Sequence, residues 1–400
     1  MSTASPLSIR LPGADRRLET YALSMAPPLA TAAPKRPFTR IAYSAAHVVA
    51  DPLASSDPWL TAALDWDATI AYRQRLWSLG LGVAEAMDTA QRGMGLDWPT
   101  SLELIRRSLD AARDHPGALV ASGCGTDHLA FDASTTVDDV IRAYEEQMAA
   151  IESLGGRLIV MASRALARVA TSAADYERVY DRILMQSKQP VILHWLGDMF
   201  DPALSGYWGN ADVDTAMATA LGVIAANPGK VDGIKISLLD KDKEIAMRRR
   251  LPAGVRMYTG DDFNYAELIA GDGVGETKNQ QHSDALLGIF DAIAPAASAA
   301  LAALSDGHLD RFHAILAPTV PLSRHIFQAP TRFYKTGIVF LAWLNGHQSH
   351  FAMVGGQQSA RSLGHFAEIF RLADRARLIE QPELAVARMR HLLAMHGIDG

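Results

Sequence analysis

One lysine interrupts an apolar segment in the second half of the chain. Lys235 lies within Val231–Ser237 (VDGIKIS), a stretch typical of a buried β-strand. Lysine is rarely buried without a partner, so it either pairs with a carboxylate or is an amine of lowered pKa. A neutral amine is a nucleophile that forms a Schiff base with a carbonyl compound. This segment alone leaves the ion pair and the catalytic amine equally open.

A histidine ends another apolar run, and further polar residues follow others. His194 closes Val191–His194. Because histidine titrates near neutral pH, His194 is a candidate proton shuttle. The candidates for substrate binding are His47, Glu85, Asp88, Thr89, Gln91, Asp198, Ser237, Asp261, Asn264 and Lys278. Many of these side chains accept hydrogen bonds, which suits a substrate rich in hydroxyl groups.

Several of these residues also have a purely structural interpretation. Glu85 could be the ion-pair partner of Lys235, and His194 could be a histidine satisfied within the core. Asp261 or its neighbour Asp262 could cap the following helix. Cys124 is more typical of a small buried residue than of a nucleophile.

Short apolar runs alternate with amphipathic stretches from Thr39 onward, and this rhythm predicts a parallel (β/α)8 TIM barrel. The eight expected strands are 40–44, 82–86, 119–122, 158–162, 191–194, 233–237, 256–259 and 271–277. The candidate polar residues then gather at the C-terminal ends of the strands, where barrels of this kind carry their chemistry. A doubly wound open sheet is the alternative, but no Gly-x-Gly-x-x-Gly follows the first strand.

The expected helices lie between and after these strands. Those within the barrel are 69–79, 99–114, 136–154, 172–186, 213–227 and 241–251, and Thr136 with Asp139 resembles a capping box. After residue 284 the pattern is helical, at 292–304, 308–316, 362–372 and 382–396, and the only strand signal there is a weak one at Gly337–Leu341.

The chain therefore divides into three expected regions. Residues 1–38 form an N-terminal extension that covers the barrel floor or a neighbouring subunit, 39–295 form the barrel, and 296–400 form a C-terminal helical region. Trp343, Phe351 and Phe366 are candidates for a subunit contact in a homo-oligomer, or they pack on their own barrel. Two C-terminal stretches are candidates for a lid over the site: Arg332, Tyr334 and Lys335, and the segment 355–358.

Composition favours a cytoplasmic enzyme with a small-molecule substrate. The chain has 400 residues, 49% of them apolar, and a net charge of −6 without a long basic run, which argues against nucleic acid as a partner. Its one cysteine cannot form a disulfide within the chain, as suits a reducing compartment. No signal peptide is evident. The alanine-rich stretch 292–304 is too short to cross a membrane.

With its motifs placed, the chain resembles the class I aldolases of the dihydrodipicolinate synthase and N-acetylneuraminate lyase family. The residues that carry the resemblance are Gly233-Ile234-Lys235 with Asp240, Pro190–Leu193, Gly260-Asp261-Asp262, and Gly273-Val274 leading into Thr277 and Asn279. The resemblance spans about residues 39 to 295. It implies that Lys235 forms a Schiff base with a ketone, and that the iminium ion then permits aldol cleavage, condensation or dehydration without a cofactor.

The departures from that family pattern concern the substrate. His194 stands where the family usually has a tyrosine, and Asp88-Thr89-Ala90 stands where two threonines and a glycine hold the carboxylate of a 2-oxo acid. An arginine common after the fifth strand is missing, with Asp198 in that stretch. Because an aspartate repels a carboxylate, these changes predict a neutral polyhydroxy ketone, such as a keto-sugar, and a place in carbohydrate metabolism.

Three hypotheses follow from the sequence. The first is a Schiff-base lyase or aldolase in which Glu85, Asp88 and Asp198 orient the substrate. The second is a sugar isomerase or epimerase in which Glu85, Asp88, His194 and His47 hold a divalent metal such as Mn, Mg or Zn. The third is a non-enzymatic sugar-binding protein in which Lys235 is locked in an ion pair with Glu85.

Overall fold

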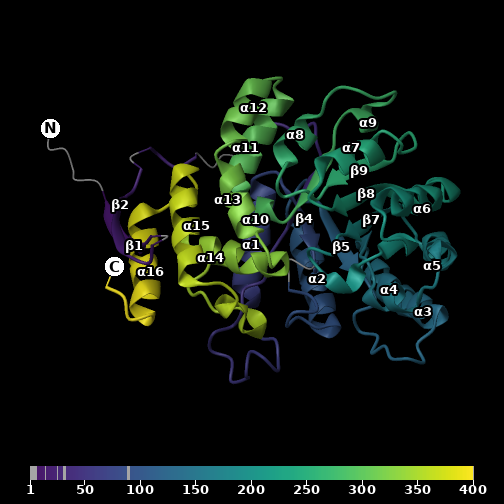
Figure 1. Ribbon diagram of the computed structural model, residues 1–400, viewed down its shortest axis with the longest axis horizontal. Helices are drawn as coiled ribbons and strands as arrows, with labels where there is room; N and C mark the ends of the chain where they lie inside the picture. Colours follow the sequence, from purple (N-terminus) through teal and green to yellow (C-terminus); the bar gives the residue numbers. More distant parts are fainter. Residues whose placement is uncertain (1–6, 14, 25, 30–32, 88–90, 400) are drawn as a thin grey trace.

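The computed structural model describes residues 7–13, 15–24, 26–29, 33–87 and 91–399, and its centre is a closed barrel of eight parallel strands (Figure 1). The strands are β3 (Ala42–Ala45), β4 (Gly82–Glu85), β5 (Val120–Cys124), β6 (Arg157–Val160), β7 (Val191–Leu196), β8 (Val231–Ser237), β9 (Arg256–Thr259) and β10 (Asp284–Leu287). They follow one another in chain order, and β10 closes the barrel against β3. The predicted TIM barrel is confirmed, and the open sheet is excluded.

Seven of the eight strands lie where the sequence predicts them, but the eighth does not. The predicted strand 271–277 contains Gly271, Gly273 and Gly275, all with positive φ, so this segment turns instead of extending. The eighth strand is the short run β10, which pairs with β9 and β3. β10 has only four residues and is followed by a long helical region. Its apolar run is therefore too short to be recognised as a strand from the sequence.

Helices separate the strands and cover the outside of the barrel. The long ones match the predicted helices to within a few residues: α1 (Trp66–Ser78), α2 (Trp98–Arg113), α3 (Val137–Ser153), α5 (Ala173–Gln186), α6 (Val213–Ala226) and α7 (Lys241–Arg248). The capping box of Thr136 and Asp139 is present at the start of α3. Shorter helices are α4 (Arg164–Val169), α8 (Tyr265–Ala270), α9 (Lys278–Gln281) and α10 (Ile289–Ala292).

The C-terminal region packs on one side of the barrel (Figure 1). It contains α11 (Ala294–Ser305), α12 (Leu309–Leu316), α13 (Thr319–Ile326), α14 (Tyr334–Leu344), α15 (Leu363–Arg375) and α16 (Pro382–Met395), with the 3-10 turns η4 (Thr331–Phe333) and η5 (Val354–Ser359). The weak strand signal at Gly337–Leu341 is wrong, because these residues lie in the buried helix α14. None of the helices in the described ranges is both long and apolar enough to cross a bilayer.

The three aromatic residues considered for a subunit contact pack on one another within the chain. The rings of Trp343 and Phe351 stack with centroids 5.6 Å apart, and Phe351 and Phe366 meet edge to face at 5.2 Å. Trp343 and Phe366 are buried, so the alternative of packing on their own chain holds. A homo-oligomer stays a prediction. These three residues do not support it, because they pack within their own chain.

The N-terminal extension forms a hairpin on the C-terminal helices. Its strands β1 (Ser8–Pro12) and β2 (Leu18–Ala22) pair antiparallel, and Figure 1 shows them beside α15 and α16. Leu11 is fully buried there, and the Tyr21 hydroxyl donates a hydrogen bond of 2.6 Å to Asp374. The later part of the extension reaches the barrel, because Pro34 and Phe38 lie against Gly80, just before β4. A contact with a neighbouring subunit stays a prediction. The hairpin of the extension packs on α15 and α16 in the C-terminal region of the same chain.

Candidate active site

Lys235 and His194 lie in register on neighbouring barrel strands. The two residues are partners in the pairing of β8 with β7, so their side chains leave the sheet on the same face. Both side chains are nearly covered, with exposed fractions of 5% for Lys235 and 2% for His194. The His194 Nε2 lies 3.3 Å from the hydroxyl oxygen of Ser237, the residue two positions after the lysine. The imidazole and the hydroxyl are thus in contact, and Lys235 extends from the same face of the sheet.

A glycine on the next strand makes room for this group. Gly260 follows β9 directly, and a Cβ atom there would lie 2.7 Å from the Lys235 Cε and 2.2 Å from the Ser237 hydroxyl oxygen. It would also lie 2.6 Å from the backbone carbonyl oxygen of Ile236. Any side chain at position 260 would therefore displace the lysine stem or the strand itself.

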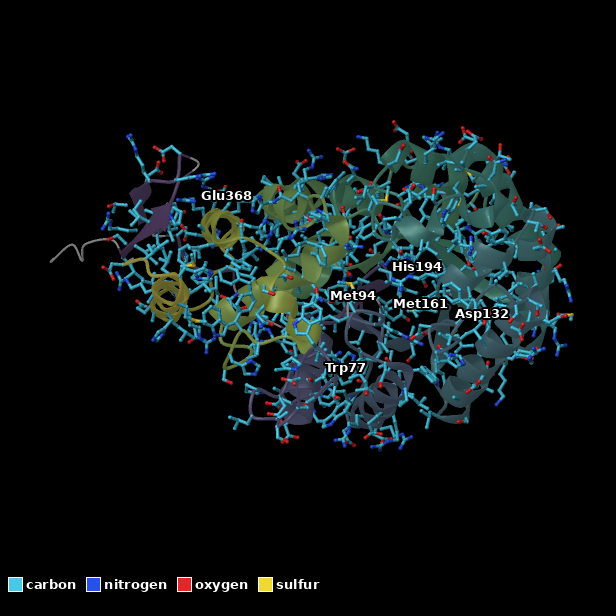
Figure 2. All side chains as sticks on the ribbon, turned by 60° about the horizontal axis from the view of Figure 1, so that its bottom comes forward. Trp77, Met94, Asp132, Met161, His194 and Glu368 are labelled. Atoms are coloured by element: carbon cyan, nitrogen blue, oxygen red, sulfur yellow. The ribbon has the colours of Figure 1, made fainter. Side chains whose placement is uncertain are left out.

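Two cavities that share a wall open at this end of the barrel. The first, of about 340 Å³, is lined by His194, Met161 and Thr126 among others. The second, of about 320 Å³, is lined by residues of the C-terminal region, namely Arg332, Phe333, Tyr334, Lys335 and Gln357, together with Met94. Figure 2 labels His194, Met161 and Met94 between the barrel and the C-terminal helices. Both stretches considered for a lid therefore contribute to the mouth of the site.

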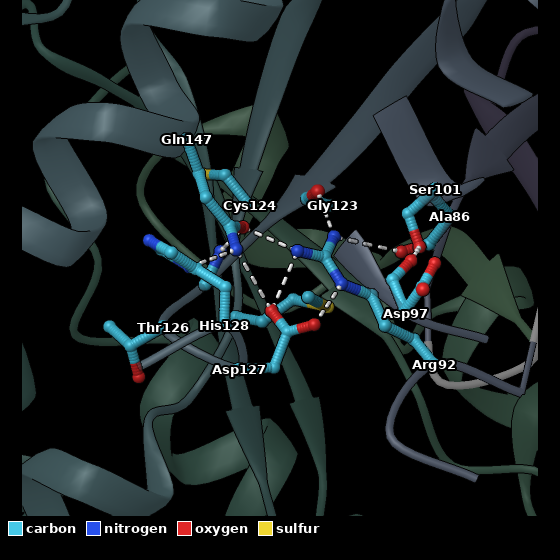
Figure 3. A network of polar contacts seen from close by, with 12 residues as sticks. Ala86, Arg92, Asp97, Ser101, Gly123, Cys124, Thr126, Asp127, His128 and Gln147 are labelled. Atoms are coloured by element: carbon cyan, nitrogen blue, oxygen red, sulfur yellow. Dashed lines mark hydrogen bonds and ion pairs between the residues drawn. The ribbon is translucent and has the colours of Figure 1, made fainter. Parts of the chain in front are cut away.

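An arginine network that the sequence reasoning missed supports the shared wall (Figure 3). Arg92 donates to both carboxylate oxygens of Asp127, at 3.0 and 2.7 Å, and to the carbonyl oxygen of Gly123 at 2.6 Å. Gln147 accepts a further bond from Arg92 and donates to His128 at 2.7 Å. Burial alone would raise the pKa of Asp127, but the charge and hydrogen bonds of Arg92 hold it below its ordinary value. The only signal in the sequence was that Arg92 and Asp127 follow strands.

Glu85 does not belong to the site. Its carboxylate is bound by Arg73 of α1 through two hydrogen bonds of 2.9 Å, and both side chains are fully buried. In β4, Ala84 faces the barrel interior and Glu85 faces the helices, because side chains alternate along a strand. The expected substrate contact of Glu85 is therefore wrong, and so is its ion pair with Lys235.

His47 and Gln91 are buried structural residues. The His47 Nδ1 lies 2.9 Å from a carboxylate oxygen of Asp291 in α10, and its ring packs 4.5 Å from that of Tyr72 in α1. Gln91 donates to the carbonyl oxygen of Val354 at 2.8 Å, which ties the loop after β4 to η5. Both side chains are fully buried and committed to these partners, so their expected contacts with substrate are not supported.

The polar residues after β9 hold the turn that follows this strand. Asp261 accepts hydrogen bonds from the backbone of Phe263 at 2.8 Å and from the side-chain amide of Asn264 at 2.8 Å. Burial raises the pKa of this carboxyl. Asp262 accepts from the backbone of Ile289 at 2.8 Å, at the start of α10. Asp261 and Asn264 thus bind each other, but neither aspartate caps the following helix α8, whose N-cap residue Asn264 makes no side-chain cap bond, so the helix-capping interpretation is wrong.

Asp198 and Lys278 lie outside the candidate site around Lys235 and His194. Asp198 is exposed and lines another cavity, with Asp240 and Lys243. Lys278 lies in α9, before the eighth strand, and its neighbour Asn279 donates to the carbonyl oxygen of Val255, just before β9. Lys278 is therefore at the N-terminal end of the barrel. The misplaced eighth strand had put it at the wrong rim.

The ligands expected for a metal are not brought together. No group of three or more His, Cys, Asp or Glu side chains that could hold a metal occurs among the described residues. His47 and Glu85 are committed to Asp291 and Arg73, while Asp88 and Thr89 lie outside the described residues. Cys124 is buried, and burial raises the pKa of its thiol to about 12, so it is not a thiolate ligand or nucleophile at neutral pH.

Comparisons with known proteins agree with this architecture. A family model described as "Protein of unknown function (DUF993)" matches residues 9–398, and no curated protein sequence matches the chain. Three of the similar solved structures belong to or carry the name of the dihydrodipicolinate synthase family.

The first is YagE, a prophage protein from E. coli K12 in complex with pyruvate (TM-score 0.65, 15% identity, covering 85% of this chain and 99% of that one). The second is a 4-hydroxy-tetrahydrodipicolinate synthase from Methylacidiphilum fumariolicum SolV (0.60, 13%, 88% and 99%). The third is a putative dihydrodipicolinate synthetase from Pseudomonas aeruginosa (0.58, 17%, 82% and 98%). The likeness in fold confirms the resemblance seen in the sequence.

Proposed function

The chain belongs to the DUF993 family of proteins of unknown function, and we propose that it is a lyase of the class I aldolase type. The observation that carries the proposal is the placement of Lys235, nearly buried and in register with His194 at the end of a barrel where a cavity opens. The likeness of the fold to dihydrodipicolinate synthase structures supports the same reaction class by analogy.

The residues allow a balanced sequence of steps. The Lys235 amine attacks the substrate carbonyl, and loss of water from the carbinolamine gives an iminium ion. The iminium withdraws electrons from the neighbouring carbon, so that a C–C bond breaks or a C–H proton leaves. His194 accepts the proton from the substrate and returns it to the product, with Ser237 at 3.3 Å fixing the imidazole. One water then hydrolyses the product iminium, which releases the carbonyl product and restores the Lys235 amine.

The substrate in this proposal is a small oxo compound of the keto-sugar type. The prediction of a neutral substrate came from Asp88, which lies outside the described residues, and from the missing arginine after the fifth strand. The further argument from acceptors at the rim fails, because Glu85, Asp198 and Asp261 do not converge there. We therefore retain a small oxo compound as the substrate. Its charge is inferred below from the residues that line the mouth of the site. A cytoplasmic location and a homo-oligomeric state stay predictions.

The two other hypotheses lose their specific support. The metal-dependent isomerase needs His47 and Glu85 as ligands, and both have other partners. The hypothesis of a non-enzymatic binding protein requires an ion pair between Lys235 and Glu85. The carboxylate of Glu85 is paired with Arg73 instead. Activity that disappears on dialysis against EDTA and returns with Mn²⁺, Mg²⁺ or Zn²⁺ would bring the isomerase forward again.

The decisive experiment is reductive trapping with borohydride. The intact protein is incubated with a panel of ketoses and 2-oxo acids, reduced, digested, and read by peptide mass spectrometry. We expect an adduct on Lys235, and no adduct in K235R, because a guanidinium does not form a Schiff base. The matched control is K188R at an exposed lysine, which should be trapped as readily as the unaltered protein.

A second readout does not depend on the choice of carbonyl compound. Competitive labelling with acetic anhydride over a range of pH compares the reactivity of Lys235 with that of Lys188. Because only the neutral amine attacks a carbonyl or an anhydride, the proposed mechanism predicts that Lys235 reacts at lower pH than Lys188. If Lys235 forms no adduct and also titrates like Lys188, the Schiff-base mechanism is wrong.

A further inference from the structure

The described lining of the two cavities carries more cations than carboxylates. Arg92, Arg164, Arg332 and Lys335 line these cavities, whereas the carboxylates among the lining residues are Asp127 and Asp201. The excess is local, because the whole chain carries a net charge of −6. A positively charged cavity in a negatively charged protein favours an anionic ligand.

The two arginines that contact carboxylates are engaged to different extents. Arg92 is nearly buried and bound to Asp127 through two nitrogens, so it is structural. Arg164 contacts Asp201 through its Nε, and no hydrogen bond within the described residues uses its two terminal nitrogens. One of these terminal nitrogens lies against Gly93, 3.3 Å from the position a Cβ atom would take. The glycine thus lets the guanidinium reach the shared wall.

Arg332 supplies a cation with no carboxylate partner among the described residues. It belongs to η4, is exposed, and its guanidinium carbon lies 4.8 Å from the ring centre of Phe333. Arg332 and Arg164 line the same cavity. Arg164 comes from the barrel, at the start of α4, whereas Arg332 comes from the C-terminal region. Two guanidinium groups that line one cavity supply the kind of donors that recognise phosphate or carboxylate.

We propose that the substrate carries an anionic group, phosphate or carboxylate, remote from its reacting carbonyl, and that Arg164 and Arg332 bind this group. The inference rests on the proposed function for the position of the carbonyl, beside His194 in the inner cavity. The anion occupies the outer cavity, which shares its wall with the inner one. The C-terminal region then serves as part of the substrate site, and it distinguishes substrates by their charged tails.

The first experiment tests the anion site without any Schiff-base chemistry. Binding of glycerol 3-phosphate, glycerate and glycerol to the full-length protein is measured by calorimetry at low salt. None of these probes has a carbonyl group, so the result does not depend on the reactivity of Lys235. We expect at least one anion to bind about tenfold more tightly than glycerol, and the tighter one identifies the preferred group.

Two substitutions with opposite effects separate recognition from general folding effects. R332Q should weaken binding of the preferred anion about three- to tenfold, while D201N should strengthen it, because Asp201 competes with the ligand for Arg164. The control R311Q removes an exposed arginine of α12 outside both cavities and should change nothing. Thermal unfolding of each variant checks that the fold persists.

The second experiment connects the anion to the reaction. Borohydride trapping on Lys235 is compared for dihydroxyacetone and dihydroxyacetone phosphate, and the phosphate form should be trapped at about tenfold lower concentration. Equal binding of all three glycerol probes would overturn the anion site, whatever the trapping result. Selective anion binding without any trapping on Lys235 would keep the anion site and contradict the proposed function instead.

Discussion

At the scale of single residues, the geometry of the candidate site depends on the lack of a side chain at Gly260. Lys235 can lie beside His194 only because position 260 carries no Cβ atom, which would come within 2.7 Å of the lysine stem. The position of a reactive amine is thus set by a glycine on a neighbouring strand. Sequence patterns show the lysine and the glycine, but not that they meet.

This dependence gives a direct prediction for G260A. The added methyl group would press on the Ser237 hydroxyl and on the carbonyl oxygen of Ile236, which cannot rotate away. We expect a stability loss of about 1–3 kcal/mol and at least about a tenfold slower trapping on Lys235, because the amine is displaced. Urea denaturation and the rate of borohydride trapping measure the two effects.

The matched control is G222A, in the middle of α6. A Cβ atom there meets nothing within 4 Å, so the change should be neutral or slightly stabilising, by up to about 1 kcal/mol. If G260A is trapped as fast as the unaltered protein, Gly260 does not position the lysine.

At the scale of elements, alternation along each strand decides which polar residues can meet substrate. Lys235 and His194 face the barrel interior, whereas Glu85 faces the helices and joins α1 to β4. A carboxylate at the end of a barrel strand therefore has two very different roles, separated by a shift of one residue.

Removing one partner of the Arg73–Glu85 pair tests this assignment. In E85A the Arg73 guanidinium stays buried without its carboxylate, so we expect a loss of about 3–5 kcal/mol in the free energy of unfolding. The control is E103A on α2, whose carboxylate pairs with Arg106 and Arg107 near the surface, and its loss should be much smaller. Urea denaturation gives both values.

Trapping on Lys235 distinguishes the structural role of Glu85 from a role in binding. Measured where E85A is still folded, the concentration of ketone needed for trapping should stay close to that of the unaltered protein. A large rise in that concentration, with little loss of stability, would place Glu85 in the site after all.

At the scale of the whole molecule, one apolar cluster runs through all three regions of the chain. It contains Leu11 of the hairpin, Leu76 and Leu287 of the barrel region, and Phe340 and Phe370 of the C-terminal region. Regions that share a continuous core should unfold together, because exposing one part removes the contacts of the next.

We therefore expect a single unfolding transition that depends on the hairpin. L11A removes a fully buried side chain and should destabilise the whole protein by about 2–5 kcal/mol, with coincident transitions in tryptophan fluorescence and far-UV circular dichroism. The control L53A changes a leucine that is 91% exposed and should have no effect. Two separate transitions would show that the hairpin and C-terminal region fold independently of the barrel.

Sequence patterns correctly predicted the barrel and most of its helices, and they singled out Lys235 and His194 as candidates that the fold brings into register. These features depend on local periodicity and on a polar residue in an apolar run, and both are short-range properties of the chain. The eighth strand escaped because β10 has only four residues, and its strand character comes from pairing with β3 and β9.

Which polar residues lie together at the candidate site could be seen only in the folded chain. Glu85 and His47 stand at strand ends like true site residues, yet Arg73 and Asp291 bind them from distant parts of the chain. Conversely, Arg332 lies far along the sequence from Lys235 and reaches the same mouth. A side chain's direction and its nearest opposite charge are properties of the folded packing, because residues remote in sequence supply both.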